Sequence, residues 1–327
     1  MVPEERTVSV VIVSWNAKRY LAQCLESLSA ERCKPSMEIV VVDNDSTDGS
    51  PEYVEKHHPK VRLVRNRSNL GFAKANNIGI REAAGKYVCL LNSDVKVLAD
   101  CVAKLVNFCE AHPEVGMVGP RIMGGDGKLQ RSCRGFPGLW NMLCRALSLD
   151  GLFPRCKPFG GYLRRYQDYG KLAPADILSG CFWMIRREAL KDVGLLDESF
   201  FMYGEDMDWC KRFWEAGWGI FYVPQAEAIH YGGASSANAP VRFFIEKQRA
   251  DLQYWRKHHG RLARGCYFLI SCLYHLLRII GHAGAACLRK HRAQAHRFKM
   301  KRSWCCLCWM VAPRANSWSN GLEATAK

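Results

Sequence analysis

The sequence predicts an α/β protein in which a mixed, mostly parallel, Rossmann-like sheet is flanked by helices. Residues 8–14 form an uninterrupted, largely β-branched run, which is typical of a parallel strand buried on both faces. Further short apolar runs alternate with helical patterns, and this alternation favours parallel pairing. Two of the runs end in acidic residues, and a doubly wound sheet binds its ligands beyond the carboxyl ends of its strands.

The remaining elements are expected in a regular order along the chain. Residues 123–175 interrupt that order, because they are rich in glycine, proline, arginine and aromatic residues and show weak periodicity. They predict long loops with a short helix. The other predicted elements are a helix over 19–30, strands over 38–42 and 61–65, a loop entering a helix over 69–84, a strand over 87–91, ordered structure over 177–186 and a last strand ending near His230.

The segment 195–217 predicts a helix whose first turn is acidic. Glu205, Asp206 and Asp208 fall within four residues, and apolar residues then recur at helical spacing until a glycine ends the pattern. Asp208 and Arg212 are four residues apart, so we expect them to pair. Carboxylates at a helix N-terminus complement the helix dipole by about 0.3–1 kcal/mol, so this segment alone does not require a functional explanation.

Asp43 follows the second predicted strand and opens a turn rich in Asp, Ser and Gly. These residue types dominate ordinary turns and helix N-caps, which is the structural alternative. A carboxylate at the strand end is also placed to accept hydrogen bonds from a pyrimidine or a ribose. Both interpretations stay open on the residues alone.

Asp94 and His230 also fall at strand ends. Each has a structural alternative, a turn for Asp94 and a packed histidine for His230. As metal ligands they would suit Mg²⁺, which binds carboxylates and substrate phosphates, or Mn²⁺, which also accepts an imidazole. The chain has no GxGxxG after its first strand and no GxxxxGK[ST], so a nucleotide diphosphate would be neutralised by a metal and side chains instead.

The positive charge of the chain is concentrated near its C-terminus. The formal net charge is +16, and residues 241–302 alone hold 15 Lys and Arg against two acidic residues. A basic protein invites a nucleic-acid interpretation, but no recognised reader fold and no base-stacking aromatic cluster is visible. We therefore expect no nucleic-acid partner.

The sixteen cysteines show no regular disulfide framework. Cys89, Cys181 and Cys210 are expected to be small core residues. The cluster of three cysteines at 305, 306 and 308 lacks a matching second half, so we do not expect a zinc site there. The acidic N-terminus leads straight into a strand, which predicts no signal peptide and a reducing, cytoplasmic setting.

Seven segments, in this order, resemble the large glycosyltransferase family 2. The resemblance extends over residues 8–240, and the SCRGFP at 132–137 and NSD at 92–94 are most similar to the bacterial rhamnosyltransferase branch. The resemblance implies a GT-A nucleotide-sugar-binding fold and an inverting reaction. The segments are VSVVIVSWN at 8–16, VVDNDSTDGS at 41–50, NLGFAKANNIG at 69–79, LLNSD at 90–94, GCFWMIRREAL at 180–190, LLDESFFMYGEDMDWCKRFWEAGW at 195–218 and AIHYGGASS at 228–236.

The resemblance also assigns roles in binding the nucleotide-sugar donor. Asp43 would contact the nucleotide base, with Ser14 and Asn16 in the same pocket. The residues that would shape the rest of the donor site are Asn69, Gly71, Asn77 and Ser93.

By the same resemblance, Asp94 would bind a divalent metal, Mg²⁺ or Mn²⁺, and His230 would complete its coordination. Many relatives have a DxD pair where this chain has the single aspartate of NSD, so fewer protein oxygens would hold the metal. Asp206 would be the general base, with Glu205 beside it. The QxxRW signature of processive relatives is absent after the acidic helix, which predicts the addition of one sugar.

These expectations combine into one functional hypothesis and its alternatives. We expect a metal-dependent transferase that moves L-rhamnose from dTDP-L-rhamnose to a lipid-linked or surface-glycan acceptor in cell-envelope polysaccharide synthesis. The alternatives are a UDP- or GDP-hexose donor and, outside the enzymes, a catalytically silent sugar-nucleotide-binding or membrane-scaffold protein. The oligomeric state is not predicted.

We expect a catalytic domain over 1–240, with a nucleotide-binding half to about residue 120, and a basic helical segment over 241–327. The apolar run 266–277 is shorter than the roughly 20 residues of a membrane span. As a helix, residues 261–290 would carry one polar stripe about 60° wide, which suits a peripheral position on an anionic leaflet at the inner face of the plasma membrane. The alternatives are packing on the catalytic domain and a true span. The stripe consists of Arg264, Ser271, His275, Arg278, His282 and Arg289.

Overall fold

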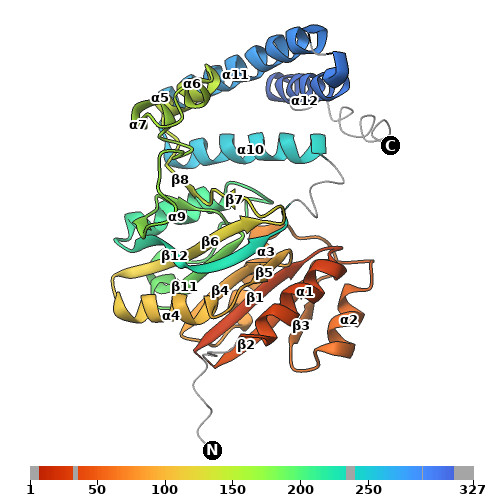
Figure 1. Cartoon of the computed structure of the whole chain (residues 1–327), viewed down its shortest axis with the longest axis vertical. Helices are drawn as coiled ribbons and strands as arrows, with labels where there is room; N and C mark the ends of the chain where they lie inside the picture. Colours follow the sequence, from red (N-terminus) through yellow and green to blue (C-terminus); the bar gives the residue numbers. More distant parts are fainter. Residues whose placement is uncertain (1–6, 32–35, 233–239, 289, 313–327) are drawn as a thin grey trace, which may run out of the picture. The chain divides into compact units, whose positions relative to one another are not determined.

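The structure, a computed structural model, describes residues 7–31, 36–232, 240–288 and 290–312. The chain divides into two compact units, and Figure 1 labels most of their elements. The sheet unit comprises residues 1–136 and 167–235, and the helical unit comprises residues 137–166 and 236–327. Residues 137–166 therefore group with the C-terminal helices, which the sequence did not indicate.

The sheet unit is built on one mixed β-sheet with the strand order β3-β2-β1-β4-β11-β6-β12-β5. The first four strands of that order run parallel, β11 is antiparallel to both of its neighbours, and β12 is parallel to β6. This arrangement confirms the predicted mixed, mostly parallel sheet. The strands are β1 Val8–Ser14, β2 Met37–Asp43, β3 Arg62–Arg65, β4 Tyr87–Asn92, β5 Val95–Val97, β6 Val115–Gly124, β7 Leu129–Gln130, β9 Ala173–Pro174, β11 Phe182–Arg186 and β12 Gly219–His230, with β8 Cys133–Arg134 and β10 Ile177–Leu178 forming a separate pair.

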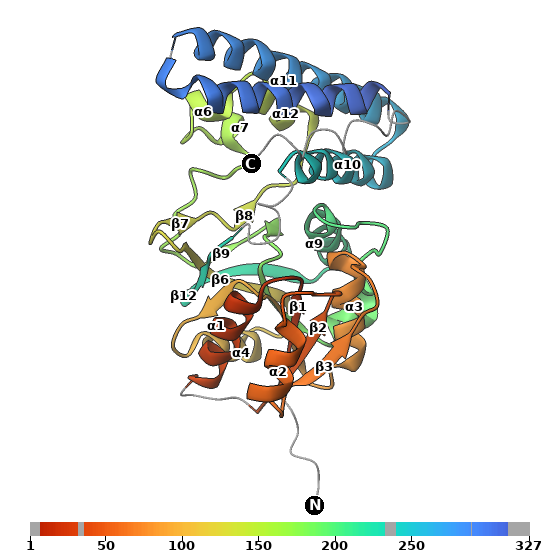
Figure 2. The ribbon, with the colours of Figure 1, turned by 90° about the vertical axis from the view of Figure 1, so that its right-hand side faces the viewer.

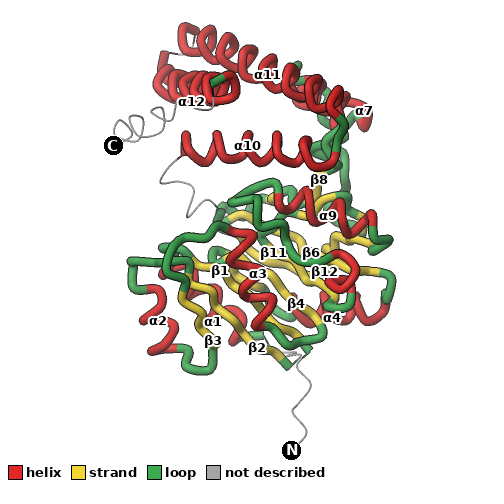
Figure 3. The backbone as a smooth tube through the Cα atoms, turned by 180° about the vertical axis from the view of Figure 1, so that it is seen from behind, coloured by secondary structure: helices red, strands yellow, loops and turns green. Residues whose placement is uncertain are grey.

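Helices cover both faces of this sheet. Helices α1, α2 and α4 lie on the face toward the viewer in Figure 1, and α3 and α9 lie on the opposite face, which is seen in Figure 3. On α3, a Cβ at Gly79 would come within 2.2 Å of Val11 Cγ1, so only glycine lets this helix approach β1 so closely. The helices of the sheet unit are α1 Lys18–Ser29, α2 Ser50–His57, α3 Phe72–Glu82, α4 Cys101–Ala111, α8 Ala189–Val193 and α9 Glu205–Glu215.

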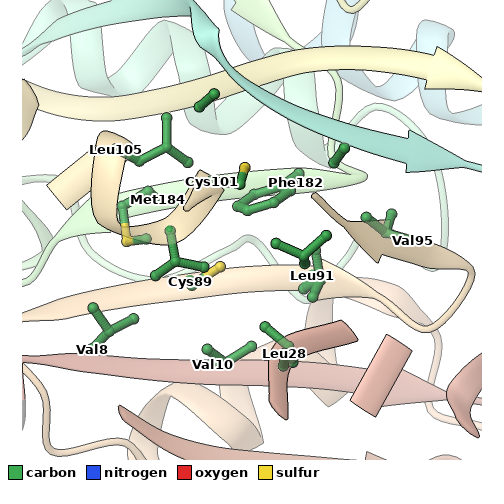
Figure 4. Close-up of a cluster of buried hydrophobic side chains, with 14 of the residues drawn as sticks. Val8, Val10, Leu28, Cys89, Leu91, Val95, Cys101, Leu105, Phe182 and Met184 are labelled. Carbon is green, nitrogen blue, oxygen red and sulfur yellow. The ribbon is translucent and has the colours of Figure 1, made fainter. Parts of the chain in front are cut away.

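The main hydrophobic core lies between the sheet and helices α1 and α4. Val8 and Val10 of β1, Cys89 of β4 and Phe182 of β11 point into it, as Figure 4 shows. Every second residue of β1 faces this core because side chains alternate along a strand. Cys89, Cys181 and Cys210 are buried and each described cysteine is free, so the prediction of cysteines as small core residues is confirmed.

The helical unit consists of three short helices from the region 137–166 and three long C-terminal helices. Helices α11 and α12 run side by side, as Figures 1 and 2 both show, and both also contact α10. The single short helix expected within 123–175 is thus three. The helices are α5 Leu139–Ala146, α6 Leu149–Leu152, α7 Lys157–Gly160, α10 Pro240–His258, α11 Arg261–Leu288 and α12 Ala293–Val311, with a 3₁₀ turn at Lys290–Arg292.

Candidate active site

The candidate site lies at the carboxyl edge of the parallel strands of the sheet unit. Ser14 ends β1 and Asp43 ends β2, and the two residues are direct neighbours in the parallel register. Asn92 ends β4 beside Val13 of β1. The strand register therefore brings the predicted nucleotide-binding residues Ser14 and Asp43 together at one edge.

Asp43 and Ser14 both carry buried oxygens that have no hydrogen-bond partner among the described residues. Asp43 Oδ2 accepts a hydrogen bond from the Ser46 amide at 3.0 Å, which fixes the carboxylate at the start of the turn. Asp43 Oδ1 and Ser14 Oγ are buried, and neither has a hydrogen-bond partner in the part of the chain that the structure describes. Because buried polar atoms are nearly always hydrogen-bonded, this adjacent pair indicates a place for a ligand that carries N–H or O–H donors.

Asn16 connects the loop after β1 to the turn after β2. Its side-chain oxygen accepts a hydrogen bond from the backbone amide of Thr47 at 2.8 Å. Its backbone amide donates to Ser46 Oγ at 2.9 Å. Asn16 is exposed and has a positive φ of 49°, which asparagine tolerates better than most residues. The structure therefore places Asn16 beside the Asp43 turn and engages its side-chain oxygen in holding that turn.

Asn44 is the centre of a polar network that sequence reasoning did not single out. Its Nδ2 donates to Asn69 Oδ1 at 2.9 Å, and its Oδ1 accepts from Asn66 Nδ2 and from the Leu70 amide, each at 3.0 Å. Asn69 Oδ1 also accepts from the Gly71 amide at 3.0 Å. The network holds the loop between β3 and α3 against the end of β2, and the side-chain oxygen of Asn69 is engaged within it.

Gly71 and Asn77 connect α3 to the segment that precedes α9. Gly71 has a φ of +83°, and a Cβ there would lie 2.4 Å from the Phe201 carbonyl oxygen. Asn77 is buried; its Nδ2 donates to the Leu196 carbonyl at 2.8 Å, and its Oδ1 accepts from the Leu196 amide at 3.0 Å. These two residues, which were predicted to shape the donor site, hold the segment before the acidic helix α9 in place.

Asp94 and His230 lie side by side, as their positions at two strand ends suggested. Asp94 Oδ1 is 3.3 Å from His230 Nε2, and both side chains are largely buried. The contact arises because β5, which begins directly after Asp94, pairs with the end of β12, where His230 is opposite Val95. Ser93, next to Asp94, is buried as well.

Gln130 on β7 orients the imidazole of His230. Its Nε2 donates to the His230 carbonyl at 2.7 Å, so its Oε1 faces His230 Nδ1, 2.9 Å away. With Nδ1 protonated and donating to Gln130, the lone pair of Nε2 points to the Asp94 carboxylate. In that tautomer the two atoms that face each other at 3.3 Å are both acceptors, an arrangement that a bound cation would stabilise.

The chemistry of this pair fits a divalent cation. One carboxylate oxygen and one imidazole nitrogen are ligands that Mn²⁺ accepts, and a second residue that orients the ligating histidine is typical of metal sites. Over the described residues, no group of three or more His, Cys, Asp or Glu side chains could hold a metal. A cation held by one carboxylate and one imidazole would take its other ligands from substrate oxygens and water.

Asp206 lies in the first turn of α9, as predicted, and forms an ion pair with Arg134 of β8. Its Oδ1 also accepts a hydrogen bond from the Met207 amide at 2.8 Å. Glu205, the first residue of the helix, is buried beside it in the chain. Asp206 is thus held at both carboxylate oxygens.

Asp208, two residues further on, has a structural role. It is completely buried, and its Oδ2 accepts from Arg212 Nε at 3.0 Å. Arg212 also donates to the carbonyls of Val193 and Leu195. The predicted pairing of Asp208 with Arg212 is confirmed.

Asp94 and Asp206 both lie near one buried thiol, that of Cys181. Burial raises the pKa of Cys181 to about 12, and the negative charges of Asp94 and Asp206 act in the same direction. Cys181 precedes β11, and its carbonyl accepts from the Asn92 amide at 3.0 Å. The candidate metal ligand and the candidate base therefore belong to one region of the sheet unit.

Three residues of this region were missed by sequence reasoning as site residues: Asn44, Gln130 and Arg134. Asn44 and Arg134 lie inside segments that carry the family resemblance, VVDNDSTDGS and SCRGFP, so a signal existed for both. Gln130 lies in a two-residue strand within the weakly periodic region. Nothing in the sequence pattern indicated that it contacts His230.

Solved structures show which fold the sheet unit has. The mannosyltransferase PcManGT from Pyrobaculum calidifontis, in complex with GDP-Man and Mn²⁺, has a TM-score of 0.55 at 18% identity; 94% of this chain and 87% of that chain are covered. GalNAc-T7 with UDP, GalNAc and Mn²⁺ has a TM-score of 0.54 at 19% identity; 77% of this chain and 50% of that chain are covered. The sheet unit has the GT-A fold of such transferases.

Sequence comparison gives the family. The family model for Glycosyl transferase family 2 matches residues 9–194. The chain is 33% identical over 262 residues to the N-acetylglucosaminyl-diphospho-decaprenol L-rhamnosyltransferase of Mycobacterium tuberculosis, and the match covers 77% of this chain and 84% of the relative. The protein belongs to glycosyl transferase family 2, is a glycosyltransferase, and resembles the rhamnosyltransferase branch.

Proposed function

We propose that the protein is a metal-dependent, inverting transferase that moves one L-rhamnosyl residue from dTDP-L-rhamnose to a lipid-linked glycan. The observation that carries the metal-dependent part is the buried pair of Asp94 and His230, whose acceptor atoms face each other at 3.3 Å. The similarity to the M. tuberculosis enzyme, whose name states an L-rhamnosyl transfer to a diphospho-decaprenol acceptor, supports the sugar and the acceptor class.

The residues at the carboxyl edge divide the binding of the donor between them. Asp43 Oδ1 and Ser14 Oγ, which have no hydrogen-bond partner over the described ranges, would receive hydrogen bonds from the nucleotide base or the ribose. Asp94 Oδ1 and His230 Nε2 would hold the divalent cation. When bound, the cation supplies positive charge that stabilises the diphosphate as a leaving group.

Asp206 is proposed as the general base of the transfer. The acceptor hydroxyl gives its proton to the carboxylate while its oxygen forms a bond to the anomeric carbon. The bond from that carbon to the diphosphate oxygen breaks on the opposite face, and the electron pair leaves with the diphosphate. Arg134 and the Met207 amide hold the carboxylate in one orientation, in which it would receive the proton of the acceptor hydroxyl.

The proposed location is the cytoplasmic face of the plasma membrane, where a lipid-linked acceptor is presented. Residues 241–302, with 15 Lys and Arg and two acidic residues, support contact with an anionic leaflet. No nucleic-acid partner is proposed.

The experiment supplies the purified chain with Mn²⁺, a lipid-linked acceptor analogue that ends in N-acetylglucosamine, and in turn dTDP-L-rhamnose, UDP-hexoses and GDP-hexoses. We expect one added rhamnose by mass spectrometry, inverted anomeric configuration by NMR, and loss of transfer on chelation. Transfer that persists after chelation and dialysis would contradict the role of Asp94 and His230. Turnover of a UDP- or GDP-hexose in place of dTDP-L-rhamnose would contradict the donor.

A further inference from the structure

Helix α11 buries polar side chains and exposes apolar ones. Its buried residues are Tyr267, Ser271 and His275, which are spaced four apart and form one stripe. A helix on the surface of a water-soluble domain has the opposite arrangement, with its apolar stripe buried and its polar face in water. The environment of the exposed face of α11 therefore needs an explanation.

The buried stripe of α11 is bonded within the helical unit. His275 Nε2 lies 3.2 Å from Gln248 Oε1 of α10, and Gln248 Nε2 lies 3.5 Å from Ser271 Oγ. The rings of Tyr267 and Trp255 stack at a centroid distance of 4.5 Å. The polar groups of α11 thus turn toward its neighbouring helices.

This orientation corrects part of the expected membrane contact. The predicted polar stripe was expected to face lipid headgroups, but Ser271 and His275 at its centre are buried, and His282 Nδ1 is 3.3 Å from His296 Nδ1 of α12. Arg278 at its edge is exposed, and Arg289 lies outside the described residues. The centre of the stripe is thus unavailable to headgroups.

The exposed face of α11 is a stripe of large aliphatic residues. Leu262, Leu269, Leu276 and Ile280 are 84%, 67%, 48% and 59% exposed. At about 100° per residue they fall within roughly 40° of one another, on the side of the helix opposite Ser271. We call these four residues the aliphatic stripe.

The exposed large apolar side chains are concentrated in the helical unit. Of the sixteen such residues exposed over the described chain, thirteen belong to the helical unit and three to the sheet unit. A large patch of exposed apolar side chains on a protein surface marks an interaction site, and the aliphatic stripe is a candidate for one. Helix α11 is also long and apolar enough to cross a membrane by length and composition.

We propose that the aliphatic stripe of α11 inserts into the hydrocarbon of an anionic phospholipid bilayer, with the helix lying in the plane of the membrane. This inference rests on the proposed function, which places the acceptor in that membrane. Charge complementarity supports the occupant, because residues 241–302 are strongly basic and attract anionic headgroups.

The neighbour of α11 favours an in-plane helix over a span. Helix α12 runs beside α11 and carries Arg297, Lys299, Lys301 and Arg302. If α11 crossed the bilayer, these charges would be drawn toward the hydrocarbon, which is costly. With α11 in the plane, its aliphatic stripe enters the acyl region while the basic residues of α12 stay at headgroup level.

The test is flotation of the full chain with vesicles of phosphatidylcholine containing phosphatidylglycerol, at low and at high salt. We expect the wild type to float at both salt concentrations, because apolar insertion is not screened. Leu269→Glu and Leu276→Glu should each reduce the vesicle-bound fraction by about tenfold or more, the equivalent of one leucine side chain kept out of hydrocarbon.

Leu172→Glu is the matched control. Leu172 belongs to the sheet unit and is 45% exposed, close to the 48% of Leu276, so it adds the same charge at an equally exposed leucine. We expect Leu172→Glu to float like the wild type. Equal flotation of Leu276→Glu and Leu172→Glu would overturn the proposal. Complete release of the wild type by high salt would also overturn it, because that outcome indicates headgroup contact alone.

A further measurement separates this inference from the proposed function. Hydrolysis of dTDP-L-rhamnose with Mn²⁺ is measured without lipid for the wild type and for Leu276→Glu, and we expect equal rates. Hydrolysis without vesicle binding overturns the membrane inference alone, whereas vesicle binding without hydrolysis of any donor contradicts the function alone. A dimer in light scattering that Leu276→Glu abolishes, without vesicle binding, assigns the stripe to a second copy and overturns the proposal.

Discussion

Arg134 and Asp206 form an ion pair between β8 and the first turn of α9, and both side chains are largely shielded from solvent. The pair connects two segments that are 72 residues apart in the chain. Asp206 belongs to the acidic helix start, whereas Arg134 belongs to the small β8–β10 sheet. The carboxylate proposed as the base is therefore positioned by a residue outside its own helix.

Asp206→Asn should abolish transfer and leave donor binding intact. The amide keeps the size of the side chain but cannot take the acceptor proton, so we expect kcat to fall by about 10²–10⁴-fold. Donor affinity, measured by titration calorimetry with dTDP-L-rhamnose and Mn²⁺, should stay within a factor of about two to three, which is within the usual variation of single interactions. Transfer near the wild-type rate would refute the assignment of the base.

Arg134→Gln should lower kcat for transfer by about tenfold or more, the equivalent of one charge-assisted hydrogen bond. Without the guanidinium, the Asp206 carboxylate has more than one orientation and meets the acceptor hydroxyl less often. The KM for the donor should change little, because Arg134 acts on the base. An unchanged kcat, or a loss confined to the donor KM, would exclude this positioning role.

A second Asp–Arg pair on α9 provides the matched control. Arg212 donates to Asp208 and to two backbone carbonyls, so Arg212→Gln should lower the free energy of unfolding by about 2–4 kcal/mol, because the buried Asp208 charge loses its partner. The fraction that remains folded should keep its kcat. If Arg212→Gln and Arg134→Gln lower kcat equally, the effect of Arg134 is structural.

The sequence was sufficient to predict the elements with strong periodicity. The predicted strand at residues 8–14 coincides with β1, and the acidic helix spans Glu205–Glu215 and ends before Gly217. These two predictions are correct because burial on both faces of a strand, or on one face of a helix, produces a local pattern of apolar residues in the sequence. The proximity of Asp94 and His230 followed from their positions at strand ends.

Strand β6 was missed because its composition resembles a loop. It contains Pro120 and three glycines, which normally interrupt a strand. The structure accommodates Pro120 at the point where the register of β12 shifts between Val223 and Glu227. Such a bulge depends on the partner strand, so the local sequence of β6 does not reveal it.

The contacts of Gln130 and Arg134 were missed for a related reason. Gln130 meets His230 across 100 residues of chain, and Arg134 meets Asp206 across 72. Each lies in a two-residue strand, which is too short to show a period. The burial of the polar stripe of α11 could not be predicted either, because periodicity shows that a helix has two faces but not which of them is buried.

Gln130→Leu should weaken activation by the metal. Loss of the hydrogen bond to Nδ1 frees the His230 ring and removes the preference for the tautomer whose Nε2 can bind a cation. Removal of such an orienting residue typically costs 10–100-fold in metal affinity, so we expect the Mn²⁺ concentration for half-maximal transfer to rise by about that factor. Activity at saturating Mn²⁺ should largely recover. A metal dependence identical to that of the wild type would argue against a ligand role for His230.

Gly71→Ala should destabilise the sheet unit and impair donor use. The backbone has a φ of +83°, and the added Cβ would lie 2.4 Å from the Phe201 carbonyl oxygen. We expect a loss of about 1–3 kcal/mol in the free energy of unfolding, in the range of other strained backbone positions. Gly127→Ala is the control, because Gly127 has a similar φ of +74° but an added Cβ there would meet no described atom within 4 Å. If both variants lose the same stability in urea unfolding, backbone strain alone explains the effect and the contact with Phe201 does not.

Glu198 gives the segment before α9 a pH-dependent contribution to stability. A hydrogen bond from Asn77, followed by contacts with Arg81, lowers the pKa of Glu198 below its usual 4.5, against a smaller opposing effect of burial. A carboxyl whose pKa is lower in the folded state stabilises the fold above its unfolded pKa. That contribution disappears as the pH falls through the folded pKa, where both states are protonated.

Glu198→Gln should therefore destabilise the protein at neutral pH and have no effect at a pH well below the folded pKa of the glutamate. Because the side chain is 36% exposed and solvent screens it, we expect a difference of less than about 1 kcal/mol at neutral pH. The measurement is urea unfolding of the wild type and the variant over this pH range. A difference that stays constant with pH would mean that the charge of Glu198 plays no part, and that the amide of the variant merely packs less well against Asn77.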